Sequence, residues 1–359
     1  MEVSPFKIKV QLIRKFILQQ PFSESKSGFG ISYTPYLSKL VNDISLGNIT
    51  YFNRLNERSA FAVSFKYFSL GEIELIQDEF SQALVTKPNE LTMDVSYSLR
   101  LADQFSMGVS LRYLRSDLKI SQVDDTAIAA SSYAVDLSGY YQGEEQAYND
   151  FNGRWRAGFI IQNLGPKIKY DESAVSASFL PTMLRLGGGF DFILDSYNKV
   201  SVTAEFSKLL VPTPPLLGTF TDYNDDNGNG IFDEDEEQIV QSYTGIISGK
   251  PNDVDFLAGV FQSFSDAPGG FNEELREFTW SLGAEYTYED SFALRAGFFN
   301  ESEDKGARKF LALGAGFKFT GTNIDLSYLF SASKVPSPLE NTLRFSLTFN
   351  FGDNEYYEY

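Results

Sequence analysis

Apolar and polar residues alternate one by one along most of the chain. In MDVSYSLRL (93–101), apolar side chains take every second position from Val95 to Leu101, and polar side chains take the positions between them. After a three-residue break, the alternation resumes from Phe105 to Tyr113. Successive side chains of a β-strand point to opposite faces, so this pattern predicts two antiparallel strands joined by a short turn.

The same period recurs along the chain and predicts an all-β fold. We expect fourteen strands, at 29–34, 44–53, 59–68, 93–101, 105–113, 133–141, 154–163, 182–194, 199–207, 277–288, 291–299, 309–319, 324–330 and 342–351. Long connections (69–92, 114–132, 164–181, 208–276, 300–308 and 331–341) then alternate with short ones (54–58, 102–104, 195–198, 289–290 and 320–323). This alternation predicts a 14-stranded antiparallel transmembrane β-barrel with long outer loops and short periplasmic turns. The connection 142–153 is too long for such a turn, and the pattern does not account for it.

A soluble β-sandwich is the alternative, because its strands also alternate apolar and polar positions. Three features favour the membrane barrel. Aromatic residues gather near strand ends, the opposite faces carry small and charged residues that suit a polar lumen, and the connections alternate in length. The final segment, TLRFSLTFNF (342–351), also presents the alternating aromatic side chains that barrel assembly requires of a terminal strand.

The amino-acid composition excludes several classes of function. The formal charge of −18 disfavours nucleic acid as a partner. The chain has no His and no Cys, which excludes Ser-His and Cys-His dyads and typical zinc sites. Any metal site must therefore use oxygen ligands, which favour calcium or magnesium. No run approaches the roughly 18 apolar residues of a transmembrane helix, which excludes a helical membrane protein but not a barrel.

The two ends of the chain depart from the barrel pattern. Residues 1–22 are basic and mixed and do not read as a signal peptide, so we expect a misplaced start or a truncation there. We expect the barrel to span 23–351 and to include the long outer loop 208–276. An acidic tail, 352–359, follows the last strand.

Several segments resemble the PorV (LptO) family of the type IX secretion system. They are SKSGFGISYTPYLSKLVNDISLG (25–47), FKYFSLGEI (65–73), NLGPKIKY (163–170), FLPTMLRLGGGFDF (179–192) and FQSFSDAPGGFNEEL (261–275). The resemblance runs from about residue 23 to about residue 351. It implies a barrel in the outer membrane of a Gram-negative, Bacteroidota-type bacterium, with its loops at the cell surface and a fold related to the FadL-type transporters.

The resemblance also implies partners and a function without catalysis. PorV-like proteins associate with the translocon SprA (Sov) and receive secreted cargo through its C-terminal domain. They pass the cargo to an attachment complex that contains the sortase PorU with PorQ and PorZ. The alternative is a FadL-like transporter of hydrophobic small molecules, which predicts a lateral opening at a kinked strand. The run Gly187–Gly189 is either such a kink or a small-residue surface of the lumen.

The stretch DDNGNGIFDEDE (225–236), within the acidic segment 222–237, matches a 12-residue calcium loop. The six positions that supply ligands in such a loop hold Asp225, Asn227, Asn229, Ile231 (through its carbonyl), Asp233 and Glu236. Gly230 occupies the position that needs a sharp turn. We therefore expect a structural Ca2+ without a catalytic role. A hairpin tip at the Asn-Gly pairs and a solvated acidic run remain as alternatives.

Two further segments of the long loop carry open interpretations. The Pro-rich run 212–215 either stiffens the exit from the barrel or only ends the preceding strand. The segment 261–278 has a Pro-Gly-Gly break, followed by residues that open a short helix. It is either a partner-binding patch or packing of the loop itself.

Overall fold

The computed structural model describes residues 25–36, 43–76, 84–119, 127–171, 177–223, 239–333 and 340–352. Structural statements below refer to these residues. The expected N-terminal segment 1–22 and all but the first residue of the acidic tail lie outside them. None of the helices in the described ranges is long and apolar enough to cross a bilayer.

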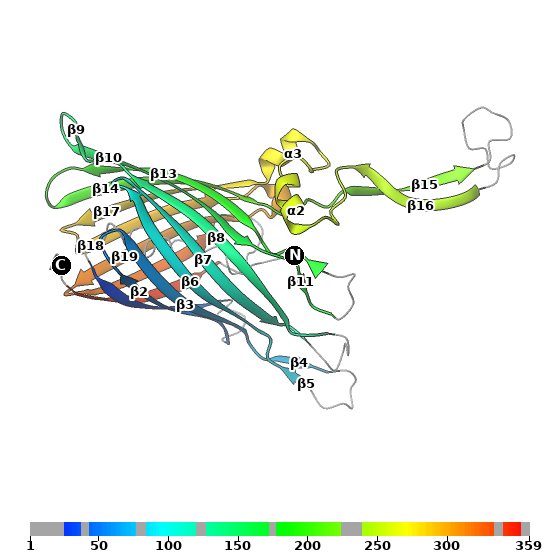
Figure 1. The fold of residues 1–359 in the computed structure, drawn as a ribbon, viewed down its shortest axis with the longest axis horizontal. Coiled ribbons are helices and arrows are strands. Elements are labelled where there is room, and N and C mark those ends of the chain that lie inside the picture. Colours follow the sequence, from blue (N-terminus) through cyan, green and yellow to red (C-terminus); the bar gives the residue numbers. More distant parts are fainter. Residues whose placement is uncertain are drawn as a thin grey trace. The chain divides into compact units, whose positions relative to one another are not determined.

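Fourteen strands of the described residues pair antiparallel into one closed barrel (Figure 1). In order around the barrel they are β1 (Ser27–Pro35), β2 (Ile44–Arg54), β3 (Ser59–Leu70), β6 (Asn89–Ala102), β7 (Phe105–Asp117), β8 (Ala130–Gln142), β10 (Asn152–Leu164), β13 (Met183–Ile193), β14 (Asn198–Leu209), β17 (Phe278–Tyr288), β18 (Phe292–Asn300), β19 (Lys309–Phe319), β20 (Thr322–Ser331) and β21 (Thr342–Phe351). The last strand, β21, pairs with β1 and closes the ring. The fold predicted from the alternation is confirmed.

Several strands are longer than the pattern predicts. Strand β6 begins at Asn89 instead of residue 93, and β7 continues to Asp117 instead of 113. The pair Asn89 and Asp117 closes their common ladder. Apolar alternation underestimates strand length because backbone hydrogen bonds continue through polar residues at the strand ends.

Long and short connections alternate as expected. Two of the long connections of the barrel carry small hairpins, one of β4 (Ile73–Leu75) with β5 (Leu84–Thr86) and one of β11 (Ile168–Lys169) with β12 (Ala177–Ser178), and a third carries the short helix η3 (Glu303–Lys305). The turn between β17 and β18 is tight, with positive φ at both Glu289 and Asp290, as a type I′ turn requires. We call the two ends of the barrel the long-loop end and the short-turn end.

The structure accounts for the connection 142–153, which the sequence pattern left unexplained. A two-residue strand, β9 (Gln146–Ala147), pairs back onto the start of β10 at the short-turn end. Tyr148 and Phe151 stack with ring centroids 5.0 Å apart, and Phe151 lies 5.3 Å from the ring of Phe192. The extra length therefore builds an aromatic cluster on the barrel rim.

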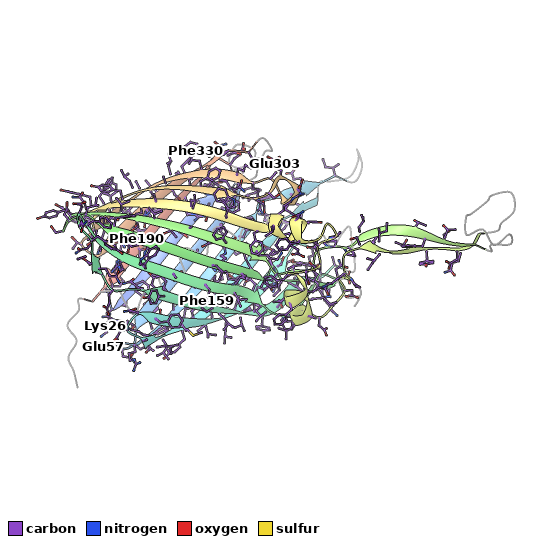
Figure 2. All side chains as sticks on the ribbon, turned by 90° about the horizontal axis from the view of Figure 1, so that it is seen from above. Lys26, Glu57, Phe159, Phe190, Glu303 and Phe330 are labelled. Carbon is purple, nitrogen blue, oxygen red and sulfur yellow. The ribbon has the colours of Figure 1, made fainter. Side chains whose placement is uncertain are left out.

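The barrel wall is apolar on its outer face and polar on its inner face, which is the opposite of a soluble protein. On β6, Val95 is 57% exposed, whereas its neighbour Asp94 is 2% exposed and Ser98 is fully buried. Phe330 on β20 lies on the outside in the same way (Figure 2). Apolar side chains point outward and polar side chains fill the interior, which excludes the soluble sandwich.

The glycine run on β13 does not kink the strand. Its members pair in unbroken register with β10 on one side and with β14 on the other. The lateral opening that a FadL-like transporter would place at Gly187–Gly189 is therefore absent from this part of the wall. Gly188 shares the outward face with Leu186 and Phe190, as the alternation along the strand requires.

Residues Leu210–Glu277 form a second compact unit, inserted between β14 and β17. It consists of an antiparallel hairpin, β15 (Leu216–Tyr223) with β16 (Ile239–Ser248), and two short helices, α2 (Phe256–Gln262) and α3 (Phe271–Arg276). We call it the loop unit. Helix α3 begins directly after Gly270, as the Pro-Gly-Gly break predicts.

Candidate functional site

A network of buried charges crosses the interior of the barrel. At its centre, the carboxylate of Asp94 on β6 accepts hydrogen bonds from Ser64 at 2.8 Å and from Lys66 on β3 at 2.9 Å. Arg112 on β7 donates to the other oxygen of Asp94 and reaches Asp136 on β8 at 3.0 Å. Lys66, Asp94, Arg112 and Asp136 are all at most 5% exposed. Buried ions are tolerable only when they are paired, and each of these four has an opposite charge as its neighbour.

Asn163 connects this network to the long-loop end. It lies at an irregularity of the β10–β8 ladder and has a φ of 55°, which asparagine adopts more readily than most residues. The bulge allows its side chain to accept a hydrogen bond from Arg112, while its backbone N–H donates to Asp136 at 2.8 Å. Its carbonyl accepts from the Thr182 hydroxyl at 2.9 Å. Asn163 opens the segment NLGPKIKY, one of those that carry the family resemblance.

Other interior charges are also paired across strands. Asp191 on β13 accepts from Arg156 at 2.8 Å, from Arg154 at 3.1 Å and from Ser201 at 2.7 Å. Arg295 on β18 bridges Glu285 and Asp325, with 2.5 Å to each carboxylate. Mutual neutralisation of these charges favours a structural role in the interior. Their partners were not predictable from sequence, because each pair depends on strand register.

The loop unit is held together by buried carboxylates. Glu274 on α3 accepts hydrogen bonds from the backbone N–H groups of Asp266 at 2.7 Å and Ala267 at 2.9 Å. Asp266 in turn accepts from the N–H of Thr213 at 3.0 Å, and the Thr213 hydroxyl donates to Glu277 at 2.7 Å. The Pro-rich run 212–215, which separates β14 from β15, is therefore held to the rest of the unit through Thr213.

Burial raises the pKa of the Asp266 carboxyl above its ordinary value. The hydrogen bond from Thr213 opposes this shift, whereas the negative charges of Glu274 and Glu277 add to it. Asp266 is 1% exposed, and its second oxygen has no hydrogen-bond partner within the described residues. This carboxyl therefore binds a proton more readily than an exposed aspartate does.

The helices of the loop unit expose large apolar side chains. Phe261 on α2 is 76% exposed, and Phe271 on α3 is 75% exposed. The exposed set consists of Leu257 and Phe261 on α2, Phe264 just after it, and Phe271 and Leu275 on α3, and we call it the apolar helix surface. Large apolar side chains that are exposed in this way are typical of surfaces that bind other proteins. The sequence indicated part of this surface, since it falls largely within 261–278.

The predicted calcium ligands Asp225, Asn227, Asn229, Ile231, Asp233 and Glu236 lie outside the described residues. The strands on either side of them are described, and β15 and β16 pair as far as Tyr223 opposite Ile239. A calcium loop and a plain hairpin tip both require the ends of β15 and β16 to be adjacent. The calcium site therefore remains a prediction. Elsewhere, the described residues contain no group of three or more acidic side chains arranged to hold a metal ion.

A closed barrel with an apolar exterior and a polar interior defines the protein as an outer-membrane β-barrel. The family model "Type IX secretion system protein PorV" matches residues 17–216, more than half of the chain. The chain therefore belongs to the PorV family, which associates it with the type IX secretion machinery.

A comparison with solved structures found a toluene transporter and a FadL homologue among the similar proteins. The chain is 11% identical to the toluene transporter TodX of Pseudomonas putida, with a TM-score of 0.49, and the match covers 96% of this chain and 94% of the other. It is 13% identical to a FadL homologue of Pseudomonas aeruginosa, with a TM-score of 0.41 and coverages of 93% and 92%. A search among curated protein sequences found no relative.

Proposed function

We propose that this protein is a non-enzymatic carrier in type IX secretion. In this role it binds the C-terminal signal domain of cargo at a SprA (Sov)-type translocon. It then delivers the cargo to the sortase PorU and the PorQ/PorZ attachment complex. The loops of the long-loop end lie at the surface of a Bacteroidota-type cell. The lack of any His or Cys is in keeping with a binding function instead of catalysis.

The apolar helix surface is the observation that carries this proposal. Phe261 and Phe271 are mostly exposed on the loop unit, which is a compact unit of its own. Burying them against a partner removes apolar area from water, which favours association. Family membership supports the identity of the partners, since it associates the chain with secretion.

A pull-down from cells that carry the secretion system tests the proposal. The tagged protein should retain the translocon or cargo C-terminal domains, and Phe261→Asp should lose them. Leu55→Asp is the matched control, because Leu55 is 57% exposed in the turn between β2 and β3 at the short-turn end. Equal recovery of partners with Phe261→Asp and with the parent protein would contradict the proposed surface.

Transport of hydrophobic small molecules, the alternative function, has less support. It requires a lateral passage through the wall, and β13 keeps all its pairs along the glycine run. Solvent extraction of the purified protein followed by mass spectrometry should then find no stoichiometric small aromatic or fatty-acid cargo.

A further inference from the structure

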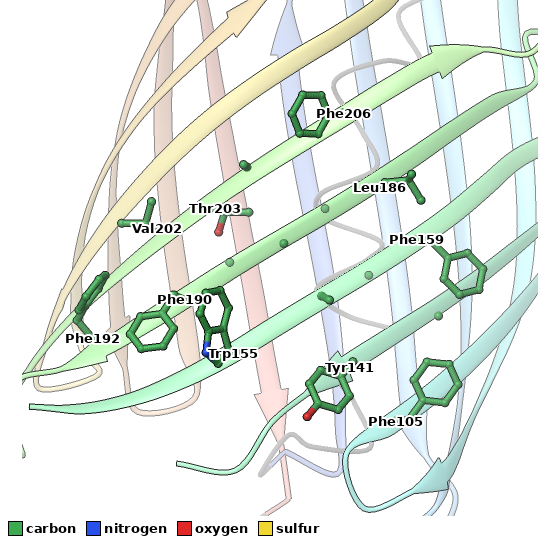
Figure 3. A pocket seen from close by; sticks show the side chains of 17 residues that line it. Phe105, Tyr141, Trp155, Phe159, Leu186, Phe190, Phe192, Val202, Thr203 and Phe206 are labelled. Atoms are coloured by element: carbon green, nitrogen blue, oxygen red, sulfur yellow. The ribbon is translucent and has the colours of Figure 1, made fainter. Parts of the chain in front are cut away.

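The outer face of the barrel carries a notch where three small residues lie side by side on neighbouring strands. Ala157 on β10 is the cross-strand partner of Gly188 on β13, and Gly188 is the partner of Ala204 on β14. These residues line a depression of about 780 Å³ (Figure 3). The wall behind it is continuous, because the three strands pair without interruption along this stretch.

Large side chains form the two walls of the notch. Trp155 and Phe190 lie toward the short-turn end, with ring centroids 4.8 Å apart. Phe159 and Phe206 form the opposite wall. Trp155 is 59% exposed and Phe206 55%, so both belong to the outward face. None of the residues that line the notch is charged.

The charges on the same strands lie on the other side of the wall. Arg154 and Arg156 alternate with Trp155 along β10 and pair with the buried carboxylate of Asp191. Arg156 thus faces the interior directly behind the small residues. Apart from the hydroxyls of Thr203 and Tyr141, the notch offers apolar surface and aromatic rings, in continuity with the rest of the lipid-facing exterior.

We propose that the notch binds one acyl chain of a bilayer lipid, with the headgroup toward the short-turn end. The outward face of a membrane barrel contacts hydrocarbon, so a lipid chain is the molecule that reaches the notch. Small residues allow the chain to approach the backbone closely and to gain dispersion contacts that a smooth wall does not provide. The aromatic rings at the short-turn end match the interfacial level where lipid headgroups begin.

This proposal does not depend on the role in secretion. A segment of another membrane protein could compete for the same notch, and a test on the purified protein in lipid vesicles separates the two occupants. The chain has only two tryptophans, Trp155 and Trp280. The substitution Trp280→Phe therefore leaves Trp155, on the notch wall, as the single fluorescent reporter.

The experiment measures quenching of Trp155 in vesicles that mix dibrominated dioleoyl phosphatidylcholine with a phosphatidylcholine of 14-carbon chains, whose shorter chains make fewer contacts in the notch. We expect quenching to exceed that of randomly distributed lipid, with a preference for the notch of roughly tenfold, equivalent to about 1.4 kcal/mol. Quenching that follows the random distribution of the two lipids would overturn the proposal. A segment of another membrane protein would then be the better candidate for the notch.

Filling the notch provides the matched comparison. In Gly188→Leu the added Cβ meets only the carbonyl oxygen of Arg156, at 3.9 Å, so the strand can accept the side chain. Gly47→Leu on β2 is the control, since Gly47 has no atom within 4 Å of an added Cβ and lies outside the notch. Gly188→Leu should reduce the preference to the random level, whereas Gly47→Leu should leave it unchanged.

Heat-dependent gel mobility verifies that each variant forms a barrel. If Gly188→Leu does not fold, Ala204→Leu fills the same notch from the neighbouring strand. A folded filling variant that keeps the full lipid preference would refute the acyl-chain site.

Discussion

Arg112 lies between two buried carboxylates, and its guanidinium is 3.0 Å from Asp136 while it also donates to Asp94. Replacing Arg112 by Met leaves both carboxylates without this cation. Loss of one partner from a buried pair typically costs about 3–5 kcal/mol, so we expect Arg112→Met to lower the free energy of unfolding by that amount. Urea titration of the protein in lipid vesicles, followed by tryptophan fluorescence, measures the change.

Lys87→Met is the control for this prediction. Lys87 pairs with Glu72 on the exposed long-loop end, where water already screens the charges. We expect little change in unfolding from its loss. If Arg112→Met were as stable as Lys87→Met, the interior charge network would not stabilise the folded barrel as its geometry indicates.

The exposed aromatic rings of the loop unit should matter for binding and hardly for stability. Phe261→Ser and Phe271→Ser should change the free energy of unfolding by less than about 0.5 kcal/mol, because both side chains are mostly exposed. Both should weaken recovery of secretion partners. Unfolding measurements test the expected stability, and pull-downs test the expected loss of partners. A large loss of stability would show that the two rings pack inside the loop unit.

Glu274→Ala should have the opposite profile. It leaves the buried N–H groups of Asp266 and Ala267 without their acceptor, at a typical cost of about 1–3 kcal/mol. Hydrogen exchange of the segment 265–277 should therefore accelerate. Exchange as slow as in the parent protein would mean that other contacts hold this turn.

Acidification should stabilise the loop unit through Asp266. Its pKa is raised in the folded unit, so the folded state binds the proton more tightly than the unfolded state does. The resulting stabilisation is complete below the ordinary aspartate pKa of about 3.9 and is lost as the pH rises through the raised folded value.

Hydrogen exchange corrected for its intrinsic pH dependence tests this sign. Protection of the loop unit should increase as the pH falls from neutrality, and Asp266→Asn should flatten the profile. Asp253→Asn removes a carboxylate from the same unit and should retain the slope. A slope that persists in Asp266→Asn would assign the effect to another group.

We propose that the acidic segment between β15 and β16 binds Ca2+ and orders the end of this hairpin. Calorimetry at millimolar calcium should show heat of binding, and the thermal transition should rise. Asp225→Asn combined with Glu236→Gln should abolish both, since these residues take the first and last ligand positions of the loop. Asp253→Asn should abolish neither, and a wild-type protein without calcium heat would refute the site.

Sequence alternation was sufficient to predict the barrel because lipid and lumen impose opposite polarity on successive residues of each strand. The alternation puts Asp94 and Arg112 at polar positions of two successive strands, and the structure pairs them across the ladder. The alternation did not reveal Lys66, Asp136 or Asn163 as their partners, because these contacts depend on register across several strands and on the bulge at Asn163. Turn chemistry and bulges that set register leave only weak traces in a single sequence.

The loop unit was less predictable for a different reason. Helix α2 has only seven residues, too few for a helical period to stand out from the surrounding apolar residues. Helix α3 was predictable because the Pro-Gly-Gly break marks its start. The notch was not anticipated either, since Ala157, Gly188 and Ala204 become neighbours only when three strands pair.

The seam between β1 and β21 has a consequence for biosynthesis. Ser27 lies opposite Phe351, because β1 pairs with β21. The ring therefore cannot close until the last strand has been synthesised. Until then both strands present unpaired edges, which a bilayer does not tolerate and which invite aggregation. A nascent chain must therefore be kept from pairing prematurely until its final segment arrives. A premature stop codon anywhere upstream of β21 would yield an open sheet that the cell has to degrade.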